Sequence, residues 1–438
     1  MYHPPSKRTQ LLQRITVYSA MSLAVITVVS ILVFFMLGYQ FNRNAGTIEQ
    51  GGLVQFNTQP SGAEVIIDGK DLGVRTAAKR TMTTGPHFIK MQRTGYRAWQ
   101  KSIDVMPGTV LWLTYARLVP KELEPVKVES FPTITSTSAS PNNKWMAIKA
   151  DAATPVIHLA DLSRDDARVT DLTLPTDSFT APSPERTHSF TLQKWDESSR
   201  YLLIKHTYDG TKTEWIVADT QDISETKNVT TLLGINASKL IFDGDNSAIL
   251  YALVDNNIRR IDLGAATLSR PLVRNVAEFS LYDDSIIVYV TRLDPSTKVR
   301  SVGYYHQGAS KSRTIRSYSD DGKVPLHLAI GKYFSDYYVA IAYNETVEIM
   351  KGTLPRSDAT NLSVFDAVST MAVPGGVRHL SVVTNGRFVV AQTPKAYIVR
   401  DVELNKTTTT VLKGDTPVKQ ELRWLDDYTV WSDQNGML

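Results

Sequence analysis

Histidines and one acidic turn are the residues of this sequence whose types could support metal or acid–base chemistry. The histidines are scattered, without the short spacing that presents several ligands to one metal ion: His3, His87, His158, His188, His206, His306, His327 and His379. The acidic turn, FDGDN at Phe242–Asn246, holds two close carboxylates but lacks the further ligands and the distal Glu of a calcium loop. We interpret the histidines as structural residues and FDGDN as a turn between strands.

Sequence motifs of enzymes are missing from the chain. It has no phosphate-binding loop, no GxGxxG after a strand, no GxSxG and no HExxH. The absence of cysteine excludes thiol catalysis, disulfides and cysteine-ligated metals. SDQNG at Ser432–Gly436 departs from the Ser-x-Asp-x-Gly-x-x-Trp repeat of sialidases. We therefore predict no catalytic residue, no metal and no cofactor, although spacing cannot reveal a carboxylate pair contributed by two strands.

The longest apolar stretch, Ile15–Tyr39, predicts how the chain relates to a membrane. No charged residue falls between Arg14 and Arg43. A helix of about 25 residues is roughly 37 Å long, enough to cross a hydrocarbon core of about 30 Å. Serine and threonine hydroxyls within it can bond to the helix backbone, so they do not prevent insertion. We predict a transmembrane helix at residues 15–41 that contacts the lipid bilayer.

Two other interpretations of this stretch are weaker. A cleaved signal peptide has an apolar run of about 7–15 residues followed by a small-residue cleavage site. This run is longer and ends in bulky rings: Phe34, Phe35, Tyr39 and Phe41. A helix buried in a soluble domain does not need so long an uncharged run. We expect Tyr39 and Phe41 to lie in the outer interfacial belt, where amphipathic rings are favoured.

The charges that flank the stretch predict its orientation. Lys7, Arg8 and Arg14 precede it, whereas Arg43 and then Glu49 follow it. Positive charge favours the cytoplasmic side, so residues 1–14 would be a cytoplasmic basic leader. The sequence therefore predicts a single-pass protein of the cell membrane whose C-terminal body is extracytoplasmic.

Residues 42–52 are polar and contain glycine, which predicts a linker, and residues 53–119 then show the pattern of a small β-sandwich. The expected strands are rich in β-branched and aromatic residues and lie at 53–57, 63–68, 87–93, 98–105 and 109–118. Alternation predicts two shared faces: one with Trp99, Lys101, Ile103 and Val105, and one with Val110, Trp112, Thr114, Ala116 and Leu118.

Several short motifs of this region resemble those of the PEGA domain. They are Pro60-Ser61-Gly62-Ala63, Val65, Ile67-Asp68-Gly69-Lys70, Leu72-Gly73, Gly85, His87 and Gly95-Tyr96. One departure is Thr76-Ala77, where the family usually has Thr-Pro. The resemblance implies a small β-sandwich module of exported or surface proteins of bacteria and archaea, and it brings no catalytic residue.

The same region is basic. Residues 51–120 carry nine Lys/Arg and four Asp/Glu, a net charge of +5. Such a charge could attract anionic lipid or an anionic wall polymer, although an ordinary solvated face would have the same composition. Nucleic acid is not predicted, because no long basic run is interleaved with aromatic residues.

Residues 120–140 predict a linker, and residues 141–438 a β-propeller built from a repeated pattern. A polar turn precedes a four-residue apolar strand that begins at Trp145, Tyr201, Ala248, Ile286, Tyr338, Phe388 and Tyr428. These starts lie on average about 47 residues apart, which suits one propeller blade. A following strand ends near Asp161, Asp219, Asp262 or Asp401, whose carboxylates we expect to bond to the next backbone N–H groups. The region resembles the irregular propellers of WD-like and Tol-type periplasmic proteins.

Seven copies predict about seven blades, of which the last is incomplete. A turn at Asn435-Gly436 is followed by two residues only. Either a strand near Val126–Phe131 completes the last blade, or the sequence ends inside a blade.

These observations predict a mainly β protein with one N-terminal transmembrane helix, a PEGA-like sandwich and an irregular propeller. Propellers commonly bind ligands where the loops of every blade converge. We expect an extracytoplasmic binding or scaffold protein of the cell envelope, whose propeller recognises an unknown envelope protein, a peptide or a glycan through residues that the sequence does not reveal. The alternative is an extracytoplasmic hydrolase or lyase acting on glycan or peptide, which would need convergent carboxylates of raised pKa.

Overall fold

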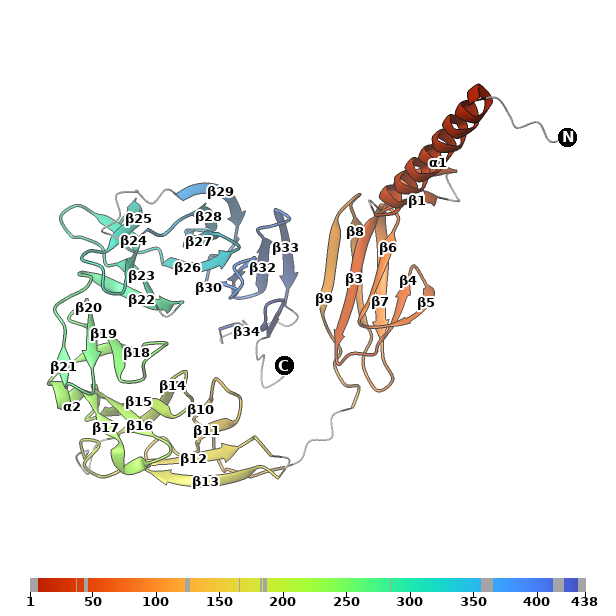
Figure 1. Cartoon of the computed structure of the whole chain (residues 1–438). Coiled ribbons are helices and arrows are strands. Elements are labelled where there is room, and N and C mark those ends of the chain that lie inside the picture. Colours follow the sequence, from red (N-terminus) through yellow and green to blue (C-terminus); the bar gives the residue numbers. More distant parts are fainter. Residues whose placement is uncertain are drawn as a thin grey trace. The chain divides into compact units, whose positions relative to one another are not determined.

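The computed structural model describes residues 7–36, 38–42, 46–122, 127–164, 166–181, 183, 187–283, 285–355, 365–412 and 421–431. The chain divides into two compact units, Met1–Pro125 and Val126–Leu438, each with its own strands (Figure 1).

The first element is helix α1 (Lys7–Met36), whose segment Arg14–Phe34 is long and apolar enough to cross a membrane. No part of that segment is buried against the rest of the protein. The hydroxyls of Thr16 and Thr27 donate to the carbonyl oxygens of Leu12 and Leu23 at 2.9 and 2.8 Å, as expected for a helix in an apolar medium.

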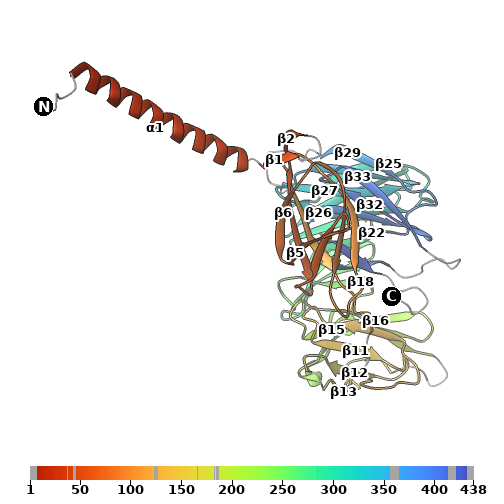
Figure 2. The same ribbon diagram turned by 90° about the vertical axis from the view of Figure 1, so that its right-hand side faces the viewer.

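The helix ends earlier than residue 41, the end that the sequence predicts. Gly38 has a φ of +79°, a conformation that an α-helix cannot contain. After it, β1 (Tyr39–Asn42) pairs antiparallel with β2 (Thr47–Gln50), so the expected linker at 42–52 contains a strand of this hairpin. Figure 2 shows the hairpin between α1 and the sandwich strands. The backbone N–H of Gly51 donates to the Gly38 carbonyl at 2.9 Å, which joins the hairpin to the chain that follows.

The first unit contains a sandwich of two sheets. One sheet has the order β6 (Ala78–Met82), β3 (Gly52–Gln59), β9 (Val110–Arg117), with β3 and β9 parallel. The other has the order β5 (Lys70–Arg75), β4 (Glu64–Ile67), β7 (Gly85–Gln92), β8 (Trp99–Val105). The sequence predicts five of these strands and misses β5 and β6, which lie at sheet edges and carry mostly exposed, polar residues.

The predicted face of β8 is confirmed at its second half, where Ile103 and Val105 are buried in the core. The predicted sharing of one face of β9 by Val110, Trp112 and Ala116 is wrong, because Val110 and Trp112 are 47% and 53% exposed whereas Ala116 is 1% exposed. The pairing with β3 shifts register after Leu113, so β9 contains a bulge. In a regular strand, residues three apart such as Leu113 and Ala116 point to opposite faces. The extra residue of the bulge brings both side chains to the buried face.

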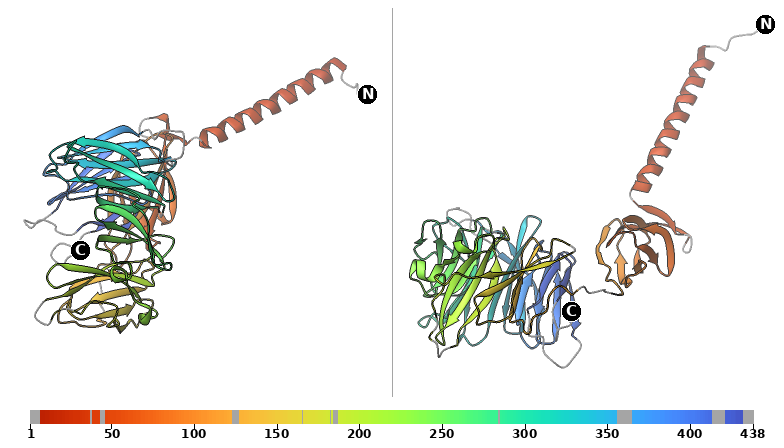
Figure 3. Two further views of the ribbon diagram at one scale, coloured as in Figure 1. Left: turned by 90° about the vertical axis from the view of Figure 1, so that its left-hand side faces the viewer. Right: turned by 90° about the horizontal axis from the view of Figure 1, so that it is seen from below.

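The second unit is a series of antiparallel four-stranded sheets that follow one another in chain order around a common centre (Figures 1 and 3). The first three sheets are β10 (Ser136–Ala139), β11 (Trp145–Lys149), β12 (Val156–Asp161) and β13 (Arg168–Thr173); β14 (Ser189–Trp195), β15 (Tyr201–Tyr208), β16 (Lys212–Asp219) and β17 (Lys227–Asn228); and β18 (Ala237–Phe242), β19 (Ile249–Val254), β20 (Asn257–Asp262) and β21 (Thr267–Leu268). The next three are β22 (Val276–Tyr282), β23 (Ile286–Thr291), β24 (Val299–His306) and β25 (Arg313–Ser319); β26 (Leu326–Tyr333), β27 (Asp336–Tyr343), β28 (Thr346–Gly352) and β29 (Phe365–Ala372); and β30 (His379–Val382), β31 (Phe388–Gln392), β32 (Ala396–Asp401) and β33 (Lys406–Val411). A short helix, α2 (Val229–Leu233), follows β17.

The predicted repeat is confirmed, because each predicted apolar strand is the second strand of a sheet: β11, β15, β19, β23, β27, β31 and β35 (Thr429–Trp431). The four aspartates are also confirmed as the last residues of third strands. The carboxylates of Asp219, Asp262 and Asp401 each accept two backbone N–H groups from the following residues, and that of Asp161 accepts one.

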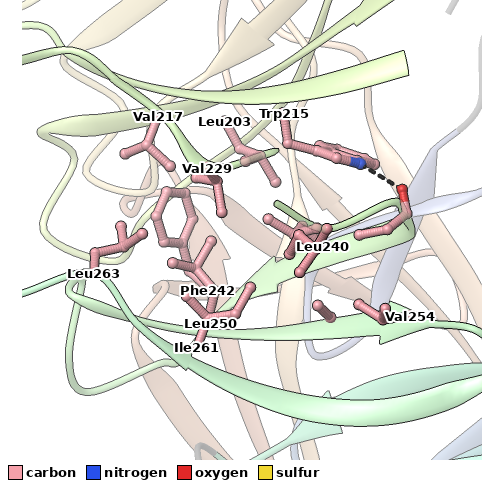
Figure 4. Close-up of a cluster of buried hydrophobic side chains, with 13 residues drawn as sticks. Leu203, Trp215, Val217, Val229, Leu240, Phe242, Leu250, Val254, Ile261 and Leu263 are labelled. Atoms are coloured by element: carbon pink, nitrogen blue, oxygen red, sulfur yellow. Dashed lines mark hydrogen bonds between the residues drawn. The ribbon is translucent and has the colours of Figure 1, made fainter. Parts of the chain in front are cut away.

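Neighbouring sheets pack through apolar clusters. Figure 4 shows one between β16 and the strands of the next sheet, in which Leu203 and Leu240 are buried. Trp215 is 4% exposed, and its Nε1–H donates to the carbonyl oxygen of Ala237 at 2.7 Å. The hydrogen bond gives the indole N–H of Trp215 a partner within an otherwise apolar cluster. It also joins β16 to β18 of the next sheet, which helps to set the packing of the two sheets.

The last described sheet is two-stranded, with β34 (Arg423–Asp426) paired to β35. The explanation that a strand near Val126–Phe131 completes it is wrong for the described residues 127–131, which form no strand. The centre of the Phe131 ring instead lies 4.6 Å from the centre of the His158 ring, in the first sheet. The predicted turn at Asn435-Gly436 lies outside the described residues.

Candidate functional site

A pocket of about 300 Å³ opens where the first strands of three consecutive sheets end. These strands are β14, β18 and β22, each the first strand of its sheet and the one nearest the common centre (Figure 1). The lining residues come from the strand ends and the turns after them: Lys194, Trp195, Glu197, Lys239, Ile241, Phe242, Asp243, Gly244, Ser280 and Leu281. Concave sites that join apolar walls to a few polar groups are the usual form of ligand pockets.

Each of the three strands carries a register shift against its neighbour. The shifts lie between Leu192 and Trp195, between Ala237 and Lys239, and between Val276 and Glu278. Bulges redirect side chains from one face of a strand to the other. The bulge in β14 is consistent with an exposed Lys194 next to the buried Trp195. The three bulged strands thus carry charged residues as well as residues of the apolar core.

Two lysines give the pocket its cationic groups. Lys194 lies 3.7 Å from the carboxylate of Glu197, in an exposed ion pair. The Nζ of Lys239 donates to the carbonyl oxygen of Phe279 at 2.8 Å and lies 5.5 Å from the centre of the Phe279 ring. An exposed pair contributes little to stability, so Lys194 can exchange Glu197 for an anionic group of a ligand at small cost.

The FDGDN segment lines this pocket as the turn after β18. Asp243 is 6% exposed, and its two carboxylate oxygens accept from the Asp245 N–H at 3.1 Å and from Gln307 Nε2 at 2.6 Å. The second bond reaches the neighbouring sheet. Both oxygens therefore have structural partners, and among the described residues no group of three His, Asp or Glu could hold a metal ion.

Asp196, in the turn after β14, is a structural residue that sequence reasoning missed. It is 1% exposed and accepts from the N–H groups of Arg200 and Tyr201 at 2.9 and 2.7 Å, and from the hydroxyls of Ser198 and Ser247. Ser247 belongs to the next sheet. Asp196 and Asp243 thus both connect adjacent sheets beside the pocket.

Arginine–aspartate ion pairs also join the start of a second strand to the end of the third strand in two sheets, at the ends of β16 and β32. Arg200 directly precedes β15, and its Nε donates to Asp219 at 2.9 Å. Arg387 directly precedes β31, and its Nη2 donates to Asp401 at 2.8 Å. Two of the four carboxylates that cap turns, those of Asp219 and Asp401, therefore also accept from an arginine, a role that the sequence pattern alone did not predict.

The described histidines lie apart in the fold, as their spacing suggests, with two exceptions. His87 bonds to Asp68, His158 to Asp171 and His306 to the Leu354 carbonyl, at 2.6, 2.6 and 2.7 Å. His3 lies outside the described residues. These contacts agree with structural roles, and they do not test whether a ligand binds elsewhere.

The first exception is a buried group in the second sheet. His206 Nδ1 and Glu214 Oε1 lie 2.7 Å apart, with side chains 0% and 1% exposed, and His188 Nδ1 lies 3.3 Å from His206 Nε2. Glu214 also accepts from the N–H and hydroxyl of Thr180 and from Asn228 Nδ2, at 2.7, 2.9 and 2.9 Å. Burial alone would raise the pKa of Glu214, but these donors lower the pKa to about 2.

The second exception is a group at the starts of inner strands, whereas the pocket lies at their ends. His327 is the second residue of β26, and His379 is the first residue of β30. Burial lowers the pKa of His327, while the charge of Glu278 on β22 opposes that effect. His379 Nδ1 lies 3.6 Å from the carboxylate of Glu421. The fold therefore gathers two histidines and two glutamates that are distant in the sequence.

Hydrolysis of a glycan would need a carboxyl group of raised pKa. Among the described residues, the carboxyl groups whose pKa is clearly displaced all have it lowered: Asp68, Asp161, Glu214, Asp219, Asp294, Asp320 and Asp321. In the pocket, Glu197 and Asp243 have partners of their own. No observation on the described residues therefore favours a catalytic site.

Comparison with known families identifies the sandwich. Residues 52–121 match the PEGA domain. The match includes the Pro60–Ala63 turn, which the structure holds through Thr76: its Oγ1 accepts from the N–H groups of Gly62 and Ala63 at 3.1 and 3.0 Å. The predicted resemblance is thus confirmed for this part of the chain. No curated protein matches the sequence significantly.

Comparison with solved structures finds distant similarity only. A chain of the yeast heterotrimeric Nup82-Nup159-Nup116 nucleoporin complex is 9% identical, with 64% of this chain and 85% of that chain covered and a TM-score of 0.41. The tricorn protease is 12% identical, with 81% and 37% covered and a TM-score of 0.42. A prolyl endopeptidase is 14% identical, with 80% and 50% covered and a TM-score of 0.42. Similarity at this level carries no inference about activity, and this chain spans half or less of the two peptidases.

Proposed function

We propose that this protein is a single-pass, membrane-anchored binding or scaffold protein of the cell envelope. In this proposal α1 spans the membrane, the PEGA domain follows it outside the cytoplasm, and the series of sheets is the recognition platform. The basic leader and the length of the apolar segment support the anchor. The finding that carries the binding role is the pocket that three innermost strands form together.

The pocket favours binding over catalysis. Its walls combine Trp195, Ile241 and Leu281 with two lysines, so it can hold an apolar group and an anionic or hydrogen-bonding group at once. Proteins, peptides and envelope glycans all present such combinations. The carboxylates beside it accept bonds that connect the sheets, which suits a rigid, preformed binding surface.

Photo-crosslinking of the full chain in its native cells tests the binding role. A photoreactive residue at Ser280, in the pocket, should give adducts whose mass spectra identify a protein, peptide or glycan. The matched control places the same residue at Thr267, in an outermost strand, and should give fewer adducts. Loss of the Ser280 adducts in a Lys239→Glu variant would support the pocket. Equal labelling at both positions would refute it.

Protease accessibility tests the anchor and its orientation. Protease added to intact cells should digest the body of the protein and leave a small protected N-terminal fragment. Full protection would reverse the proposed orientation. A mature chain that lacks residues 1–36, by N-terminal mass spectrometry, would show instead that the apolar segment is a cleaved signal.

A further inference from the structure

The outer face of the sheet β6–β3–β9 exposes apolar side chains among uncharged polar and basic ones, and it has no acidic side chain. Val110 and Trp112 of β9 pair with Leu53 and Gln55 of β3, and Lys79 of β6 pairs with Gln55 on the other side. These partners share one face, opposite to the buried Val54 and Leu113. The four acidic residues of 51–120 lie outside these three strands: Glu64, Asp68, Asp71 and Asp104.

This face adjoins the point where α1 gives way to the sandwich. The backbone N–H of Gly51 donates to the carbonyl of Gly38, two residues beyond the helix end. A Cβ built on Gly38 would lie 3.4 Å from the Gly51 carbonyl oxygen and 4.0 Å from the Thr81 side chain. Thr81 pairs with Leu53, so it belongs to the same outer face. A backbone hydrogen bond therefore joins the chain at the end of the span to the residue that precedes β3.

Further apolar side chains are exposed at the same end of the sandwich. Ile48, on β2, is 68% exposed, and Met106, in the turn between β8 and β9, is 56% exposed. The Met106 turn contacts the start of β3, because the N–H of Gly108 donates to the Gly51 carbonyl at 3.0 Å. Exposed apolar side chains therefore lie on the outer face, in the turn after β8 and on the hairpin that follows the helix.

We propose that the outer face formed by Leu53, Lys79, Val110 and Trp112 lies on the lipid bilayer, with Ile48 and Met106 at its edge. This inference rests on the proposed membrane anchor. A bilayer is the occupant that the chain supplies, because the span brings lipid to within a short hairpin of this face. Tryptophan is favoured at the membrane interface, and a lysine there is attracted to anionic headgroups. The PEGA domain would then lie on the membrane.

The absence of native cysteine makes a direct test practical, because single cysteines can be labelled in the full chain. Val110→Cys and Trp112→Cys carry an environment-sensitive fluorophore on the proposed face. The matched control is Phe88→Cys, an apolar residue that is 44% exposed on β7 of the other sheet. Each labelled chain is reconstituted in vesicles of phosphatidylcholine and phosphatidylglycerol with nitroxide-labelled lipid, and flotation confirms insertion.

Nitroxide lipid should quench the labels at 110 and 112 several-fold more strongly than the label at 88. A Lys79→Glu change should weaken the quenching at 110 in vesicles that contain phosphatidylglycerol and leave it unchanged in phosphatidylcholine alone. Equal, weak quenching at all three positions in chains that float would overturn this inference and leave the anchor standing. Shielding of 110 and 112 from a soluble quencher without lipid quenching would also overturn it, by showing a protein contact. Chains that fail to float would overturn the anchor itself.

Discussion

The carboxylate of Glu214 should make the stability of the sheets depend on pH. Its side chain is 1% exposed, and its pKa lies at about 2 against an ordinary value of 4.5. The difference corresponds to roughly 3 kcal/mol, at about 1.4 kcal/mol for each pH unit. Because the pKa is lower in the folded state, this contribution is present in full above about pH 5 and is lost as the pH falls toward 2.

The perturbation is Glu214→Gln, which keeps the shape and removes the charge. At pH 7 the variant should be less stable than the native chain by about 3 kcal/mol, because the donors from His206, Thr180 and Asn228 then meet a neutral amide. As the pH falls, the native chain loses its advantage, so the two free energies of unfolding should converge by about pH 2.

The assay is urea unfolding of the full chain in detergent at a series of pH values, followed by tryptophan fluorescence. Trp215, which follows Glu214 in the sequence and is buried, is one of the seven tryptophans whose emission reports unfolding. Glu197→Gln, in an exposed pair, is the control and should change stability by less than about 1 kcal/mol at every pH. Parallel curves for the native chain and Glu214→Gln between pH 7 and 3 would refute the reasoning.

Three further changes have expected outcomes. Asp196→Ala should lower the free energy of unfolding, measured by thermal unfolding, by about 2–4 kcal/mol, because it leaves donors of two sheets without an acceptor. The control Asp262→Ala, at a half-buried aspartate, should lower it by about 1 kcal/mol. Equal losses in the two variants would contradict the role of Asp196. Gly52→Ala should destabilise the PEGA domain by about 1–3 kcal/mol, because the new Cβ would lie 2.5 Å from Val105 and 2.7 Å from the Met106 carbonyl oxygen. Gly264→Ala, whose Cβ would meet only the Asp262 carboxylate at 3.4 Å, is the control. An unchanged midpoint of thermal unfolding for Gly52→Ala would refute the contact. The net charge of +5 at 51–120 predicts that retention of the full chain on an anionic glycan column falls steeply as salt rises from about 0.1 to 1 M; salt-independent retention would argue against attraction to anionic polymers.

Much of the sheet architecture could be predicted because it depends on neighbouring residues. The apolar four-residue strands recur after polar turns, and each is the second strand of its sheet. Asp219 and Asp401 cap turns through N–H groups two and three residues ahead, a distance that the sequence displays directly. The PEGA motif was visible for the same reason, since its turns are formed by adjacent residues.

The candidate site could not be predicted, because its residues meet only after the sheets pack. The pocket combines the ends of three strands, and a bulge in each strand changes which side chains face it. A bulge also explains the error on β9, where strict alternation placed Val110 and Trp112 on the same face as Ala116. Sequence alternation contains no mark of a bulge, since the extra residue depends on pairing with another strand.

The sequence by itself determined the features set by consecutive residues: an uncharged apolar segment of membrane-spanning length, a β-rich chain and its turns. Only the tertiary structure decided where Glu214 meets His206, where Asp196 meets Ser247, and which face of the PEGA domain remains apolar and exposed. The physical reason is range. Hydrophobic length and turn bonds act over a few residues, whereas burial, altered pKa values and pockets arise from contacts between strands that are far apart in the chain.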